Sequence, residues 1–406
     1  MRKQDKNQGK RKKRQSALLE AKRLRAQSAE SAGQGPSFED VKTMAEAGNP
    51  QAQSLLGFMY RDGRGTAQDY GQAAFWLQKA ADGGAVNAYA ALALLCQEGL
   101  GVDRDVDRAF ALYGQGAAKG DPFAEYGLGL CLEEGLGCSQ DESAAAARYE
   151  KACEAHVVQA CFKLAKLLQE GRGTPQDKER AFSLMERAAR EQFGPAMTHL
   201  AQMLLEGEGC QPDQPRAARL LGKALDLGMD SAYPQLGYIL ARGDGDEDAQ
   251  IIARRLLRQG SARGNASAMA VYGKALMAGQ GVEEDEAKAR ELLEAAAAAG
   301  HAEGKTGLGL MALLGIGEEK NPDKGLALLD EASLAGSAEA CYYAFKAYGR
   351  GENGAALDMA KASLYRERGD ACGLKGIVDW DAVLAEEEED EAPGGSPSTT
   401  EAQAGC

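Results

Sequence analysis

Residues 52–84 contain the pattern that decides the fold: AQSLLGFMYRDGRGTAQDYGQAAFWLQKAADGG. Apolar residues fall at helical spacing twice, once before and once after a loop that contains Gly63 and Gly65. Gly84 closes the segment at a position that suits a left-handed helix C-cap. The stretch therefore predicts a helix, a glycine-rich loop, a second helix and a glycine turn.

The same pattern recurs along the chain with a step of 36 residues. Alanine or glycine recurs six and eleven residues before the first glycine of each loop, and small residues allow two helices to cross closely. Asp69 and its counterparts in most copies stand where an acid caps the second helix. The Gly-x-Gly loops are Gly63/Gly65, Gly99/Gly101, Gly135/Gly137, Gly171/Gly173, Gly207/Gly209, Gly243/Gly245, Gly279/Gly281 and Gly315/Gly317, and the next step reaches Gly351.

A helical pair of this size cannot bury its own apolar faces, so neighbouring copies must stack. The consensus A-x-x-x-L-G-x-x-Y-x-x-G-x-G-x-x-x-D-x-x-x-A-x-x-x-x-x-x-A-A resembles the Sel-one-like repeat, a relative of the tetratricopeptide repeat. The resemblance covers about residues 48–350 and implies an all-α, right-handed α/α solenoid, with about eight full copies and a degenerate ninth. Ala249 replaces the aspartate in the sixth copy, and Asn353 replaces the second glycine in the ninth.

The repeat register divides the chain into four parts. We expect a basic, disordered head over 1–36, the solenoid over 37–372, a possible capping helix over 373–385 and an acidic, disordered tail over 386–406. Ser37 is expected to cap a leading helix that ends near Gly48.

Charge is distributed unevenly over a chain whose formal net charge is −14. Residues 1–35 contain 11 Lys/Arg and three acids, whereas the rest is acidic, which argues against nucleic-acid binding by the folded part. The head could nevertheless be a nuclear signal, contact RNA or anionic lipid, or only add solubility; its basic cluster is Lys10, Arg11, Lys12, Lys13 and Arg14.

Neither a signal peptide nor an apolar run long enough to span a bilayer is visible. We therefore expect a cytoplasmic protein that is not secreted, with the nucleus possible in a eukaryote. Its nine cysteines are expected to be mostly reduced. The cysteines and the three scattered histidines predict no metal site, and the Gly-x-Gly loops lack the rest of a phosphate-binding motif, so no cofactor is expected.

First helices line the concave side of related solenoids, and variable positions there can bind a peptide or protein partner. The variable position five residues before the first glycine holds Phe58, Leu94, Leu130, Lys166, Gln202 and Tyr238 in the first six copies. Leu94 and Leu130 could equally belong to the core. A row of acids directly before the first glycine could receive a basic partner or form a solvated edge: Asp62, Glu98, Glu134, Glu170 and Glu206.

The sequence favours a non-enzymatic scaffold or adaptor that binds a protein partner. The alternative is a β-lactamase-like hydrolase, by resemblance to a cysteine-rich branch of the family. Its support is the spacing of Cys153 and Cys161, although we expect both to be free thiols because no other copy contains the pair. In a third hypothesis the basic head acts and the solenoid binds its cargo.

Overall fold

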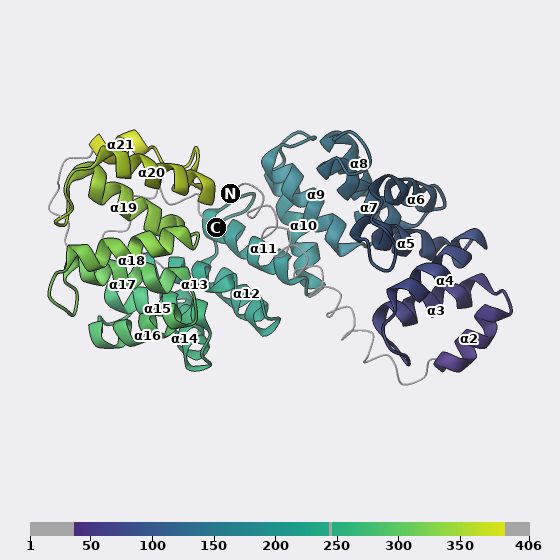
Figure 1. Ribbon diagram of the computed structural model, residues 1–406, viewed down its shortest axis with the longest axis horizontal. Coiled ribbons are helices and arrows are strands. Elements are labelled where there is room, and N and C mark those ends of the chain that lie inside the picture. The colour runs from purple at the N-terminus through teal and green to yellow at the C-terminus, as the bar shows by residue number, and fades with distance from the viewer. Residues whose placement is uncertain (1–35, 243–245, 386–406) are drawn as a thin grey trace. The chain divides into compact units, whose positions relative to one another are not determined.

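The structure, a computed structural model, describes residues 36–242 and 246–385 (Figure 1). Its described part is helical and contains no β-strand. The chain divides into two compact units at Asp177 and Lys178, which we call unit 1 and unit 2. The basic head, the loop at Gly243 and Gly245, and the acidic tail lie outside the described residues.

Unit 1 contains α2, the first three helical pairs and the first helix of the fourth pair. Its helices are α2 (Phe38–Glu46), α3 (Pro50–Asp62), α4 (Tyr70–Asp82), α5 (Val86–Glu98), α6 (Val106–Ala118), α7 (Pro122–Glu134), α8 (Glu142–Glu154) and α9 (Val158–Glu170).

Unit 2 contains the later repeats and the C-terminal segment. Its helices are α10 (Lys178–Arg190), α11 (Gly194–Glu206), α12 (Gln214–Asp226), α13 (Ala232–Ala241), α14 (Glu247–Ala262), α15 (Ala266–Met277), α16 (Glu286–Ala298), α17 (Ala302–Leu314), α18 (Pro322–Leu334), α19 (Ala338–Arg350), α20 (Met359–Gly369), the π-helical turn η1 (Asp370–Leu374) and α21 (Trp380–Ala385).

The loop residues act as the repeat pattern predicts. Gly63 ends α3 in the left-handed conformation, with φ of 67°, and Gly84 has φ of 88° after α4. Asp69 caps α4, since its carboxylate accepts a hydrogen bond from the Gln72 amide at 2.9 Å. Ser37 caps α2 in the same way. The same turn chemistry recurs from copy to copy and produces an all-α solenoid of helical pairs.

The second glycine makes close backbone contact with the preceding repeat in three loops of unit 1, those of Gly101, Gly137 and Gly173. A Cβ on Gly101 would lie 2.2 Å from the carbonyl carbon of Tyr70. One on Gly137 would lie 2.4 Å from the carbonyl oxygen of Val106, at the start of α6. At these positions only glycine fits, because the loop backbone rests directly on the backbone of the preceding second helix.

The two departures from the repeat pattern have local solutions. In the sixth copy Asp246 replaces the missing cap, since it accepts a hydrogen bond from the Ala249 amide at 3.0 Å. In the ninth copy Asn353 adopts φ of 55°, a conformation that asparagine tolerates better than most residues. Within the expected capping segment, helix forms at α21, where Trp380 packs against Phe345 of α19 with ring centroids 4.7 Å apart.

Cys153 and Cys161 form a disulfide, so the expectation of two free thiols is wrong. Cys153 lies in the last turn of α8 and Cys161 in the first turn of α9. The short connection turns at His156, with φ of 66°, and brings the two Cα atoms within 4.7 Å. The sequence spacing alone did not show how tightly this connection turns.

Candidate functional site

The candidate partner-binding residues lie on the first helix of each repeat. In unit 1 these helices are α3, α5, α7 and α9, and neighbouring first helices pack closely enough to present one surface. We call this surface the first-helix face, and describe it separately in each unit.

Three apolar side chains mark the first-helix face of unit 1. Leu94 on α5 is 41% exposed, so it is not a core residue. Phe58 on α3 and Leu130 on α7 are half-buried, and the guanidinium of Arg61 lies 4.9 Å from the centre of the Phe58 ring. Lys166 stands at the same position on α9 and is also half-buried. An apolar strip of this kind can bury side chains of a partner.

The chain itself pairs most of the acidic row. Arg61 Nε lies 2.8 Å from Asp62, and Arg172 Nη1 lies 2.9 Å from Glu170. The Gln97 amide donates to Glu98 at 3.2 Å. Glu134 is exposed. Because arginine already offsets two of these carboxylates, the row offers a basic partner less charge than its sequence indicates.

A charged network that the sequence analysis missed lies beside the apolar strip. Glu133 of α7 accepts hydrogen bonds from the Tyr149 hydroxyl at 2.6 Å and from Lys163 Nζ at 2.9 Å. Burial alone would raise the pKa of Glu133, but these two bonds and the nearby Arg172 hold it below its usual value. The network joins α7, α8 and α9 and fixes the polar edge of the face.

The acidic row and the variable position continue in unit 2. Glu206 accepts a hydrogen bond from Gln202 at 3.0 Å, and burial raises the pKa of its carboxyl. Tyr238 on α13 is half-buried, with the guanidinium of Arg242 at 5.7 Å from its ring centre.

A second missed cluster joins three first helices of unit 2. Lys274 of α15 bridges Glu303 of α17 at 3.0 Å and Glu339 of α19. Ser337 donates a hydrogen bond to Glu303 at 2.8 Å, and the two carboxyls are hydrogen-bonded to each other. The repeat register contained the signal, since Glu303 and Glu339 lie one repeat apart and therefore share a face.

The two carboxyls of this cluster have different proton affinities. Burial raises the pKa of Glu339, and the neighbouring Glu303 charge raises it further against the attraction of Lys274. Burial opposes the ionisation of Glu303 as well, but Lys274 and three hydrogen bonds lower its pKa. Glu303 is thus the ionised partner of Lys274, and Glu339 is the carboxyl that holds a proton more readily.

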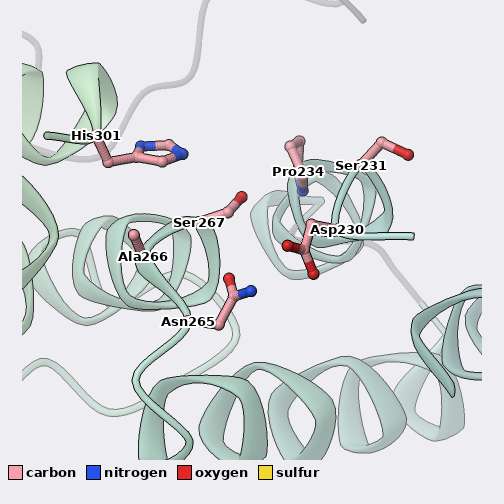
Figure 2. Close-up of a pocket in the computed structure, with 7 residues that line it drawn as sticks. All are labelled: Asp230, Ser231, Pro234, Asn265, Ala266, Ser267 and His301. Atoms are coloured by element: carbon pink, nitrogen blue, oxygen red, sulfur yellow. The ribbon is translucent and has the colours of Figure 1, made fainter. Parts of the chain in front are cut away.

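A shallow pocket of about 340 Å³ lies at the N-terminal ends of α13, α15 and α17, where Figure 2 shows Asp230, Asn265 and His301 around a common space. The side-chain oxygen Oδ1 of Asn265 caps α15 by accepting a hydrogen bond from the backbone N–H of Ala268 at 3.0 Å. His301 Nδ1 is buried without a hydrogen-bond partner. Ser231, Pro234, Ala266 and Ser267 complete the lining. The lining thus combines polar side chains with the apolar surface of residues such as Pro234 and Ala266.

The described residues contain no group of three or more His, Cys, Asp or Glu side chains that could hold a metal ion. None of the described helices has the length and apolar character needed to cross a membrane.

Stacked helical pairs whose loops contain left-handed glycines define a helical-repeat solenoid protein. The family model of the Sel1 repeat, the Sel-one-like repeat of the sequence analysis, matches residues 50–84, 86–121, 122–157, 158–193, 194–229, 231–265, 266–301 and 302–337. The chain therefore belongs to the Sel1 repeat family.

Solved structures with similar chains include two bacterial proteins. A protective antigen present in uropathogenic Escherichia coli strains is 21% identical, with 86% of this chain and 93% of that chain covered and a TM-score of 0.49. A Sel1 repeat protein from Oxalobacter formigenes is 25% identical, with 75% and 78% covered and a TM-score of 0.47. The comparison with curated proteins found no match. The family assignment rests on the eight repeat matches.

Proposed function

We propose that this protein is a non-enzymatic scaffold or adaptor whose first-helix face binds a peptide or protein partner. The observation that carries the proposal is the exposed Leu94, flanked by Phe58 and Leu130 on the neighbouring first helices of unit 1. An apolar side chain at a variable position of the repeat framework is available to a partner.

The repeat geometry indicates how such a partner would be spaced. Neighbouring packed helices lie about 8–10 Å apart. An extended chain advances about 3.3 Å per residue, so its side chains would meet successive first helices at every third residue. In the polyproline II form of extended chain, which has about three residues per turn, a ligand with apolar residues at positions i, i+3 and i+6 presents them on one face and would contact Phe58, Leu94 and Leu130 in turn. The Glu133 network beside them would supply polar contacts.

Replacing Leu94 by glutamate tests this assignment. Full burial of a leucine side chain is worth about 1.5–3 kcal/mol, so we expect Leu94→Glu to weaken the binding of a selected peptide by about tenfold or more. The peptides would come from a displayed library selected against the full chain, and their affinities would be measured by calorimetry.

Phe75→Glu is the matched control. Phe75 is 49% exposed but belongs to α4, a second helix, so this variant should bind the same peptides as the unaltered chain. Equal affinity for all three proteins, or an equal loss in both variants, would contradict binding on the first-helix face.

The hydrolase alternative stays a prediction. In the disulfide, neither Cys153 nor Cys161 offers a thiolate nucleophile, so thiol chemistry at this pair would first require reduction. Turnover of nitrocefin by the reduced protein, with loss in Cys153→Ala, is the result that would favour it.

A further inference from the structure

A second pair of cysteines meets at the C-terminal end of unit 2. Cys341 is buried on α19, and Cys372 is half-buried in η1. Both are free thiols in the structure, and they are hydrogen-bonded to each other. Two neighbouring thiols, one on α19 and one in η1, are a potential disulfide site.

The repeat register shows that the surroundings of Cys341 in the ninth copy differ from those of Cys161 in the fourth copy. Cys341 falls in the column of Cys161, five repeats later. The residue in the column of Cys153 is Ser333, whose hydroxyl accepts a hydrogen bond from Arg368 at 2.8 Å. Cys341 therefore has no cysteine partner on the second helix of the preceding repeat, and the sulfur that reaches it comes from η1.

We propose that Cys341 and Cys372 form a reversible disulfide that fixes the C-terminal cap, η1 and α21, onto the last repeat. The cap packs against α19, the first helix of the last repeat that the structure describes. Trp380 packs against Phe345 and donates a hydrogen bond from its indole nitrogen to Asp370 at 3.0 Å. A bond from α19 to η1 would hold this cap when the terminal repeat loosens.

Formation of the bond needs an oxidant, which can be a small-molecule disulfide such as oxidised glutathione. The half-buried Cys372 loses its proton and attacks one glutathione sulfur, which breaks the glutathione S–S bond and releases one thiolate. Cys341 then loses its proton to solvent and attacks Cys372 Sγ, which forms the protein disulfide and releases the second glutathione thiolate. Two protein thiols are oxidised, and one glutathione disulfide is reduced to two thiols.

The second step should be the slow one. Burial, together with the neighbouring Cys372, raises the pKa of Cys341 to about 12, so little thiolate is present near neutral pH. Ring closure should therefore accelerate as the pH rises from 7 to 9, whereas glutathione should appear first on Cys372.

The test treats the full-length protein with oxidised glutathione under native conditions, blocks remaining thiols and identifies linked peptides by mass spectrometry. We expect a Cys341–Cys372 linkage that Cys372→Ser abolishes and Cys210→Ser leaves intact. Cys210 is also partly buried, but its sulfur contacts the Met203 carbonyl. Limited trypsin cleavage after the exposed Lys375 should be several-fold slower in the linked protein than in the reduced one.

Two results would overturn the proposal. One is separate modification of Cys341 and Cys372 without a linkage between them. The other is a linked protein whose cap is cut after Lys375 as fast as in the reduced protein. Circular dichroism of Cys372→Ser, with Cys372→Ala as the second variant, checks that loss of the linkage does not reflect loss of the fold.

Discussion

Replacing Lys274 by methionine is expected to lower the free energy of unfolding of unit 2 by about 3–5 kcal/mol, the range for removing one member of a buried ion pair. Lys274 is the cation that joins α15 to Glu303 and Glu339. Its side chain is 24% exposed, so water would solvate the two remaining carboxyls only in part. The loss can be measured by urea unfolding, followed through the buried Trp380 in a Trp76→Phe background.

Lys305→Met is the matched control because Lys305 belongs to α17 and pairs with Glu331, which is 57% exposed. A surface pair of this kind contributes about 1 kcal/mol or less. Equal losses for the two lysine variants would contradict a special role for the cluster. Adding Glu339→Gln to Lys274→Met should restore part of the stability, because it removes one of the two unpaired acids.

The deficit of Lys274→Met should also depend on pH. Without the ammonium, burial and mutual repulsion raise the pKa of both carboxyls in the folded state above their unfolded values. A carboxyl of this kind favours the folded state at low pH, and that contribution is lost as the pH rises through its folded pKa. The deficit should therefore be smaller at pH 5 than at pH 8.

Replacing Gly137 by alanine is expected to destabilise unit 1 strongly, because two separate causes add. Gly137 has φ of 69°, and the added Cβ would lie 2.4 Å from the Val106 carbonyl oxygen. The left-handed conformation costs alanine about 1–2 kcal/mol, and steric overlap typically adds about 1–3 kcal/mol. Urea unfolding followed by Trp76 fluorescence would measure the loss.

Gly120→Ala separates the two causes. Gly120 has φ of 84°, but nothing lies within 4 Å of the position that its Cβ would occupy. This variant should lose only the conformational part, about 1–2 kcal/mol. Equal losses of unfolding free energy in Gly120→Ala and Gly137→Ala would mean that Gly137 is needed only for the left-handed conformation of its loop. Contact with the preceding repeat would then not be the reason for glycine at this position.

The fold could be predicted well because successive copies of the repeat show the same structurally required residues at the same positions. Eight copies of a loop that needs left-handed residues preserve glycine at the same columns, and Gly63 and Gly84 have the positive φ that this predicts. The caps follow the same logic, as Asp69 shows. The sixth copy was harder to predict because Asp246, three residues before the usual column, caps α14 instead.

The candidate site could be predicted only in part. The register correctly placed Leu94 on a first helix, but whether it is exposed depends on how neighbouring helices pack. The acidic row looked available because sequence columns do not show that Arg61 folds onto Asp62. Lys274 stands in the variable column, five residues before Gly279, yet its partners Glu303 and Glu339 belong to another column and to later repeats.

The most direct test of the scaffold function is site-specific photo-crosslinking in the cells that produce the protein. A photoreactive amino acid would replace Leu94 in one variant and Phe75 in another, two exposed apolar positions on a first and a second helix respectively. Our account predicts that position 94 forms a discrete covalent adduct with a protein partner and that position 75 does not. Adducts at position 75 alone, or none at position 94, would contradict it.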